Sequence, residues 1–224
     1  MVHSMPLTEM NTPPSGQLAS RISSELHTGT TLRQLYATDA SEYQEMPAGV
    51  VFPKSEDDLC EVIHFVNRNK LGLILRAAGT SLAGQCVGDG LVVDESKHFT
   101  QILFVDRATR RVRVQPGVVR NELNHAIAAD DLFFGPETSI ANRAMIGGMV
   151  GNNSCGSNLI VYGSTREPCR PRSDEERNCD CPKHRLPPPD LRRHDSQSTP
   201  SRPISLTSSY FQIVKFHRIS DQNI

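Results

Sequence analysis

Apolar residues recur at steps of three and four in three segments of the chain, and this spacing predicts amphipathic helices. The helices are expected over residues 17–27, 55–70 and 118–129. In the second segment Ser55 precedes three acidic residues. A serine hydroxyl accepts a backbone hydrogen bond at a helix N-terminus, and acidic side chains favour the positive end of the helix dipole. The pattern therefore predicts that this helix begins at Ser55.

Short apolar runs bounded by polar residues predict strands between the helices. These runs lie at residues 50–52, 73–75, 91–94, 101–105 and 112–114. The polar turn at residues 106–109 predicts that the last two strands form a hairpin. Helices and strands are thus mixed along the chain, which indicates an α+β or α/β class.

The overall charge indicates no strongly charged partner. The chain has 24 Lys and Arg against 25 Asp and Glu, a formal net charge of −1, so a nucleic-acid-binding protein is not expected. No run approaches the roughly 18 consecutive apolar residues of a membrane span, and the N-terminus has no apolar signal-peptide core. We expect a cytoplasmic protein without a membrane span.

The distribution of glycine divides the chain into three parts. All 15 glycines lie between Gly16 and Gly163, whereas residues 168–224 contain none and hold 8 of the 15 prolines. Residues 1–16, with three methionines among Pro, Ser and Thr, are expected to be a disordered leader. Residues 17–167 are expected to form the folded domain, and residues 168–224 a disordered tail or sequence read from a shifted frame.

Several cysteines and histidines invite a chemical interpretation that their spacing does not support. The tail motif Cys-x-Cys-x-x-His, Cys179 to His184, lacks the paired spacing of zinc ligands, and no metal site is predicted. Cys155 lies among small residues with no base near it in sequence, so packing explains it better than nucleophilic chemistry. His64 and His125 lie on predicted helices and receive no catalytic role.

Two glycine-rich segments carry the candidate chemistry. Residues 76–85 follow a predicted strand and consist mainly of Ala, Gly, Thr and Ser. Such a loop can turn successive N–H groups toward an anion and suits a pyrophosphate, although an ordinary tight turn explains it equally well. It matches neither a P-loop nor the G-x-G-x-x-G fingerprint. Residues 146–157 hold four more glycines, a density that favours close approach of a ligand to the backbone.

Taken in order, these segments and three shorter motifs resemble the FAD-linked oxidases of the vanillyl-alcohol oxidase and p-cresol methylhydroxylase type. The motifs are Arg76 to Gln85, Val114 to Gly117, Pro136 to Ser139, Ile146 to Gly148 with Asn152 and Asn153, and Tyr162 to Arg166. The sequence is most similar to the D-lactate dehydrogenase and glycolate oxidase branch, particularly its long members with an iron–sulfur domain. The resemblance covers residues 37–167. It implies an α+β fold in which the FAD-binding first subdomain is present and the second is incomplete.

The resemblance also implies which residues bind FAD. Residues 76–81 would wrap the pyrophosphate, residues 136–139 would line the flavin, and the later glycines would let the dinucleotide lie against the backbone. Covalently flavinylated relatives have a histidine where this chain has Thr80, so FAD is expected to be non-covalent. The implied cofactor-binding residues are Arg76, Ala77, Ala78, Gly79, Thr80, Ser81, Gly84, Gln85, Pro136, Glu137, Thr138, Ser139, Gly147, Gly148, Asn152, Asn153, Gly156, Tyr162 and Gly163.

The activity implied by the resemblance is dehydrogenation of a D-2-hydroxy acid, D-lactate or glycolate, to the 2-oxo acid. A base and a carboxylate-binding Arg would come from the region after the flavin subdomains, so no catalytic residue is assigned. The resemblance implies that the intact protein adds a cap and an iron–sulfur domain and is cytoplasmic or peripheral to the inner membrane. The alternative is a flavin-binding fragment without turnover.

Overall fold

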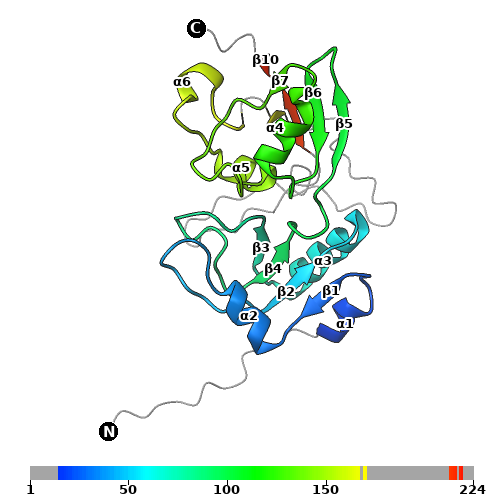
Figure 1. The fold of residues 1–224 in the computed structure, drawn as a ribbon. Helices are drawn as coiled ribbons and strands as arrows, with labels where there is room; N and C mark the ends of the chain where they lie inside the picture. Colours follow the sequence, from blue (N-terminus) through cyan, green and yellow to red (C-terminus); the bar gives the residue numbers. More distant parts are fainter. Residues whose placement is uncertain (1–14, 167–168, 171–211, 216, 219–224) are drawn as a thin grey trace, which may run out of the picture.

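The computed structural model describes residues 15–166, 169–170, 212–215 and 217–218, which form two parts, each built on a sheet (Figure 1). The first part contains residues up to the end of the fourth strand, and the second contains the later elements. No helix in these ranges is long and apolar enough to cross a membrane.

A four-stranded sheet forms the first part. Its order is β1 (Glu25–His27), β2 (Gly49–Phe52), β4 (Leu91–Asp94) and β3 (Leu73–Arg76). β1 is antiparallel to β2, whereas β2, β4 and β3 run parallel. Arg76 and Asp94 are register partners at the carboxyl ends of β3 and β4. The segments that follow these two strands therefore leave the sheet at the same edge.

Helices cover both faces of this sheet, which explains why its central strands are continuous apolar runs. α3 (Glu56–Asn69) packs Leu59, Val62 and Val66 against Val51 and Val93. On the other face, side chains of α2 (Thr30–Tyr36) pack against Val50, Phe52 and Val92. The predicted start of α3 is confirmed, because the Asp58 N–H donates a 3.2 Å hydrogen bond to Ser55 Oγ.

The predicted helix over residues 17–27 is wrong in its second half. α1 (Ser15–Ala19) is short, and Glu25–His27 form the edge strand β1. Between them, the Ser23 N–H and the hydroxyls of Ser23 and Ser24 donate to the Asp58 carboxylate of α3. Serine side chains offer the backbone an alternative to the helix. This long-range contact diverts the chain into the sheet.

The second part is built around the predicted hairpin of β5 (Ile102–Asp106) and β6 (Arg111–Val114). α4 (Arg120–Ala128) packs Leu123 and Ile127 into its core, and α5 (Ile146–Asn152) adds Ile146 and Met149. β7 (Leu132–Phe133) and α6 (Leu159–Tyr162) also belong to this part. The mixed α+β class is thereby confirmed.

Three short strands lie in the segment predicted to be disordered. β9 (Gln212–Lys215) pairs antiparallel with β6 and with β8 (Cys169–Arg170), and β10 (His217–Arg218) pairs with β7. The expectation of a tail without structure is therefore corrected for these strands, because β6 offers an open edge that β9 occupies. Residues 1–14, 171–211 and 219–224, on which the remaining leader and tail expectations fall, lie outside the described residues.

Candidate functional site

A cavity of about 480 Å³ lies between the two parts, within the range of about 300–1,000 Å³ typical of ligand pockets. The first part contributes the loop after β3, and the second contributes residues around α5, which lies at the boundary between the parts (Figure 1). The predicted site residues that line the cavity are Ala77, Ala78, Gly79, Thr80, Ser81, Gln85, Thr138, Ser139, Gly147, Gly148 and Asn152.

The loop after β3 is held in shape by Arg76. Gly79 has φ +64°, and a Cβ there would lie 2.7 Å from Arg76 Nη2. The Arg76 guanidinium donates to the Thr38 carbonyl at 2.8 Å and lies 4.9 Å from the ring centroid of Tyr36. Arg76 therefore points away from the main cavity and lines a neighbouring cavity of about 420 Å³. Its contact with the loop fixes the backbone that faces the main cavity.

Glycines of α5 bring its backbone to the cavity surface. A Cβ on Gly147 would lie 2.5 Å from Pro116 Cβ, so this glycine permits close packing. A Cβ on Gly148 would meet only Ala77 Cβ, at 3.6 Å, and one on Gly151 would meet nothing within 4 Å. Gly148 and Gly151 line the cavity. The missing side chains at these two positions therefore leave the cavity open along this face.

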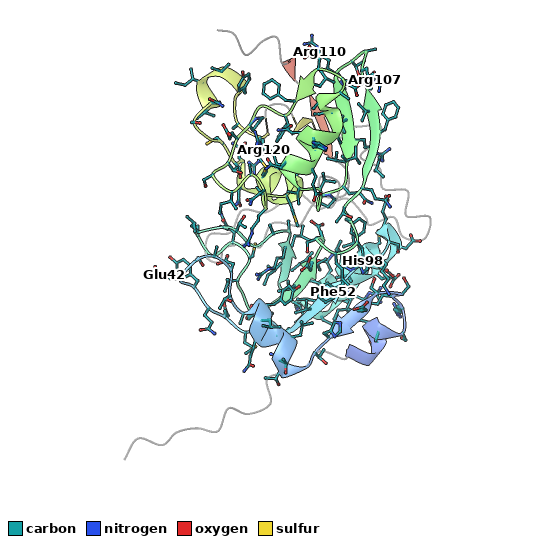
Figure 2. All side chains as sticks on the ribbon, in the orientation of Figure 1. Glu42, Phe52, His98, Arg107, Arg110 and Arg120 are labelled. Carbon is teal, nitrogen blue, oxygen red and sulfur yellow. The ribbon has the colours of Figure 1, made fainter. Side chains whose placement is uncertain are left out.

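A hydrogen bond from α4 anchors the segment at residues 136–139. Arg120, which Figure 2 places in the second part, is buried and donates from Nε to the Pro136 carbonyl at 2.9 Å. The carbonyl of Glu137 packs so closely on Gly156 that a Cβ there would lie 2.0 Å away. The Glu137 carboxylate accepts from Asn158 Nδ2 at 3.0 Å. Pro136 and Glu137 thus orient Thr138 and Ser139, which reach the cavity.

Five further predicted site residues do not line the cavity. Gly84 packs against Tyr43, Asn153 ends α5 with φ +51° and accepts from the Arg166 N–H, and Tyr162 packs edge-on to Phe133 at 5.2 Å. Gly156 packs on Glu137, and Gly163 follows α6 with φ +74°. Their direct contact with a cofactor stays a prediction.

Two residues that line the cavity carry buried polar atoms without a hydrogen-bond partner in the described part of the chain. In the described ranges, the buried side-chain atoms without a hydrogen-bond partner are Glu95 Oε1, His98 Nε2 and Thr138 Oγ1. Glu95 and Thr138 both line the cavity. Unsatisfied buried polar atoms are rare and destabilising in native proteins. Both residues that carry these atoms line one cavity, which favours a site for a polar ligand.

Sequence reasoning missed Glu95 and Cys86, which also line the cavity. Glu95 directly follows β4, whose apolar run ends at Val93 and whose last residue is Asp94, and the acidic pair at this point was the signal available. Burial, with a smaller contribution from the charge of Asp94, raises the pKa of Glu95 to about 8. Burial also raises the pKa of the Cys86 thiol. Both side chains are therefore mainly protonated at neutral pH.

The fold and the cavity define a dinucleotide-binding domain, and sequence comparison identifies its family. A sequence profile described as "FAD binding domain" matches residues 47–170. The chain belongs to this family, and its cofactor is FAD. The resemblance to FAD-linked oxidases is confirmed.

The curated relatives are much longer than this chain. It is 41% identical over 138 residues to the D-2-hydroxyglutarate dehydrogenase of Pseudomonas putida, covering 60% of this chain and 14% of that protein. It is 33% identical over 137 residues to the glycolate oxidase subunit GlcD of Bacillus subtilis, covering 60% of this chain and 29% of that protein.

A solved structure titled alkyldihydroxyacetonephosphate synthase shares the fold. Its TM-score is 0.62 at 16% sequence identity, and the match covers 86% of this chain and 38% of that chain.

The residues present fit FAD. A diphosphate needs several N–H donors close to the backbone, and the loop after β3 and the glycine face of α5 offer backbone without obstructing side chains. Thr138, which lines the same cavity, has a buried hydroxyl without a hydrogen-bond partner among the described residues. No group of three or more His, Cys, Asp or Glu side chains that could hold a metal ion occurs within the described ranges.

Proposed function

We propose that this chain is the FAD-binding portion of an FAD-dependent 2-hydroxy acid dehydrogenase. The observation that carries the proposal is the cavity between the two parts, with a side-chain-free wall at Gly148 and Gly151 and the unsatisfied Thr138 hydroxyl. The relatives' names, D-2-hydroxyglutarate dehydrogenase and glycolate oxidase, support a 2-hydroxy acid as substrate. D-lactate, implied by the sequence resemblance, is a third candidate of the same class.

In this proposal the chain's own residues bind and orient the cofactor. Backbone N–H groups of residues 77–81 receive the pyrophosphate, and the glycines of α5 let the dinucleotide lie against the helix. Thr138 and Ser139, held by the Arg120 contact to Pro136, hydrogen-bond to the flavin. Bound FAD supplies a flavin that accepts a hydride from the hydroxyl-bearing carbon of the substrate.

The side chains at the cavity favour non-covalent binding. Thr80, at the position of the histidine in flavinylated relatives, has no nucleophilic nitrogen. Cys86 is the one Cys or His side chain that lines the cavity in the described part of the chain. Since burial raises the pKa of its thiol, little of the reactive thiolate is present at neutral pH. Acid precipitation of the loaded protein should therefore release all of its flavin, and yellow pellets would contradict this.

A second candidate, FAD binding without turnover by this chain, is favoured by the composition of the cavity. Among its described lining residues there is no His, Lys or Arg. Its one carboxyl group, Glu95, is mainly protonated at neutral pH. A group ready to take the hydroxyl proton and a cation for the substrate carboxylate are thus not assigned within this cavity.

Two measurements on the full chain test these proposals. FAD titration, followed by flavin fluorescence, should show saturable binding by the wild type. The Gly148→Val variant should bind at least tenfold more weakly, because the branched side chain enters the cavity. Gly29→Val is the matched control, since a Cβ at Gly29 meets nothing within 4 Å and Gly29 does not line the cavity. Equal affinity of all three proteins would refute the assignment of the cavity.

The second measurement addresses turnover. The FAD-loaded chain is mixed anaerobically with D-2-hydroxyglutarate, glycolate or D-lactate, and flavin absorbance is followed. Bleaching by one of them would assign dehydrogenation to this chain and identify the substrate. FAD binding without bleaching by any of the three would favour the second candidate.

A further inference from the structure

Glu95 is a buried acid that follows the carboxyl end of β4, and its Oε1 atom has no hydrogen-bond partner among the described residues. It directly follows β4, and its backbone is fixed by the 2.9 Å hydrogen bond from its N–H to the Arg76 carbonyl. The residue is 4% exposed. Its Oε1 has no hydrogen-bond partner among the described residues, although Glu95 lines the cavity. A residue that lines the cavity therefore carries a buried carboxyl oxygen that the described part of the protein leaves unsatisfied.

Among the described residues, the charge that acts on Glu95 comes from Asp94 and not from a cation. Asp94 precedes it and carries the same sign, and Asp94 already accepts hydrogen bonds from Tyr36 and Ser96. Cys86 lines the same cavity but is a neutral thiol. The nearby cation, Arg76, is directed to Tyr36 and Thr38 on the other side of the loop. An ionised carboxylate here would be unpaired, and it would also repel the diphosphate of a dinucleotide.

We propose that Glu95 is a cofactor-contacting residue that, as a neutral carboxylic acid, donates a hydrogen bond to an acceptor atom of bound FAD. This inference rests on the proposed binding of FAD in the cavity. It assigns to Glu95 a role that the motifs of the sequence leave unassigned. A neutral acid can donate where a carboxylate can only accept, and it adds no charge to a site for an anionic ligand.

The protonation behaviour of Glu95 agrees with this role. Burial first, and the charge of Asp94 second, raise its pKa to about 8. The proton is therefore present at neutral pH and is lost in the mildly alkaline range. A hydrogen bond to FAD that uses this proton should stabilise the neutral form further. FAD affinity should then fall as the pH rises above about 8.

The test compares FAD dissociation constants of the full chain from pH 6 to 9.5 for the wild type, Glu95→Gln and Glu95→Leu. The wild-type constant should rise by up to tenfold per pH unit above about 8. Glu95→Gln keeps a neutral donor, so its affinity should not change in this window. Glu95→Leu cannot donate, and below pH 8 it should bind about three- to tenfold more weakly than the wild type. Glu122→Gln, which removes an exposed acid on α4, is the matched control and should follow the wild type.

Each outcome decides the question. The same pH profile in the wild type and Glu95→Gln would overturn the role of Glu95 while leaving FAD binding intact, as would wild-type affinity that rises with pH. Absence of FAD binding by the wild type at every pH would overturn the proposed function and this inference together. Should Glu95→Leu fail to fold, as judged by circular dichroism, the comparison of wild type with the nearly isosteric Gln variant still decides.

Discussion

The Glu95→Gln substitution should change how the stability of the FAD-free protein depends on pH. Glu95 has a pKa near 4.5 when unfolded and about 8 when folded. Between these values the folded state holds a proton that the unfolded state has released, so rising pH favours unfolding. Glu95 leaves stability unaffected below about pH 4.5 and lowers it progressively up to about pH 8, above which its effect is constant. The Gln variant, which does not titrate, lacks this loss.

The magnitude follows from the two pKa values. One pH unit inside the window corresponds to about 1.4 kcal/mol of unfolding free energy. By pH 7, ionisation of Glu95 in the unfolded chain costs the folded state about 3 kcal/mol relative to pH 4.5. This is a large share of the roughly 5–15 kcal/mol that stabilises a typical domain. The unfolding free energy of Glu95→Gln minus that of the wild type should therefore increase steadily between pH 5 and 8.

Urea unfolding of the apo proteins at pH 5, 6, 7 and 8, followed by circular dichroism, measures this difference. The slopes of the transitions should be equal, so that the midpoints report stability directly. Glu122→Gln, with its exposed side chain, controls for the loss of one negative charge and should stay parallel to the wild type. Parallel curves for Glu95→Gln and the wild type across the four pH values would refute the argument that Glu95 is buried without a partner.

Three further outcomes are expected. Gly79→Val should weaken FAD binding at least tenfold in a fluorescence titration, because φ is +64° and the new Cβ would lie 2.7 Å from Arg76 Nη2; unchanged affinity would remove the loop from the site. Asp58→Ala should lower the unfolding free energy, measured by urea unfolding, by about 2–4 kcal/mol, because it leaves the Ser23 and Ser24 donors unsatisfied. A loss of less than about 0.5 kcal/mol, which is the size expected for a surface substitution, would contradict the importance of this contact. Removal of residues 212–224 should destabilise the chain by about 2–4 kcal/mol in the same assay, because it deletes the ladder between β9 and β6, and an unchanged midpoint would show that this strand is dispensable.

The sequence predicts the elements whose signals are local. The apolar runs of β2, β3 and β4 are continuous because both faces of these strands are covered, and the Ser55 cap depends only on residues three positions apart. The hairpin of β5 and β6 is equally local. The predicted loop and glycine segments meet at one cavity because the loop after β3 and α5 lie on opposite sides of the boundary between the parts.

The features that sequence reasoning missed depend on distant contacts. β1 replaces the end of a predicted helix because Asp58, 35 positions from Ser23, captures the serine donors. Glu95 is buried and lines a cavity to which both parts contribute, and no pattern near residue 95 reports how the parts meet. α5 is a helix in spite of its glycines because Ile146 and Met149 pack into the core of the second part.

The pairing of β6 with β9 has a consequence for how the chain folds. Arg111 and Lys215 are register partners separated by on the order of 100 residues, so β9 can join the sheet only after its part of the chain has been synthesised. Until then β6 presents unpaired N–H and C=O groups along one side, beside the valines that the finished sheet buries. Such an edge is a template for pairing with a second chain. Newly made protein can therefore self-associate through this edge until residues 212–215 have been synthesised.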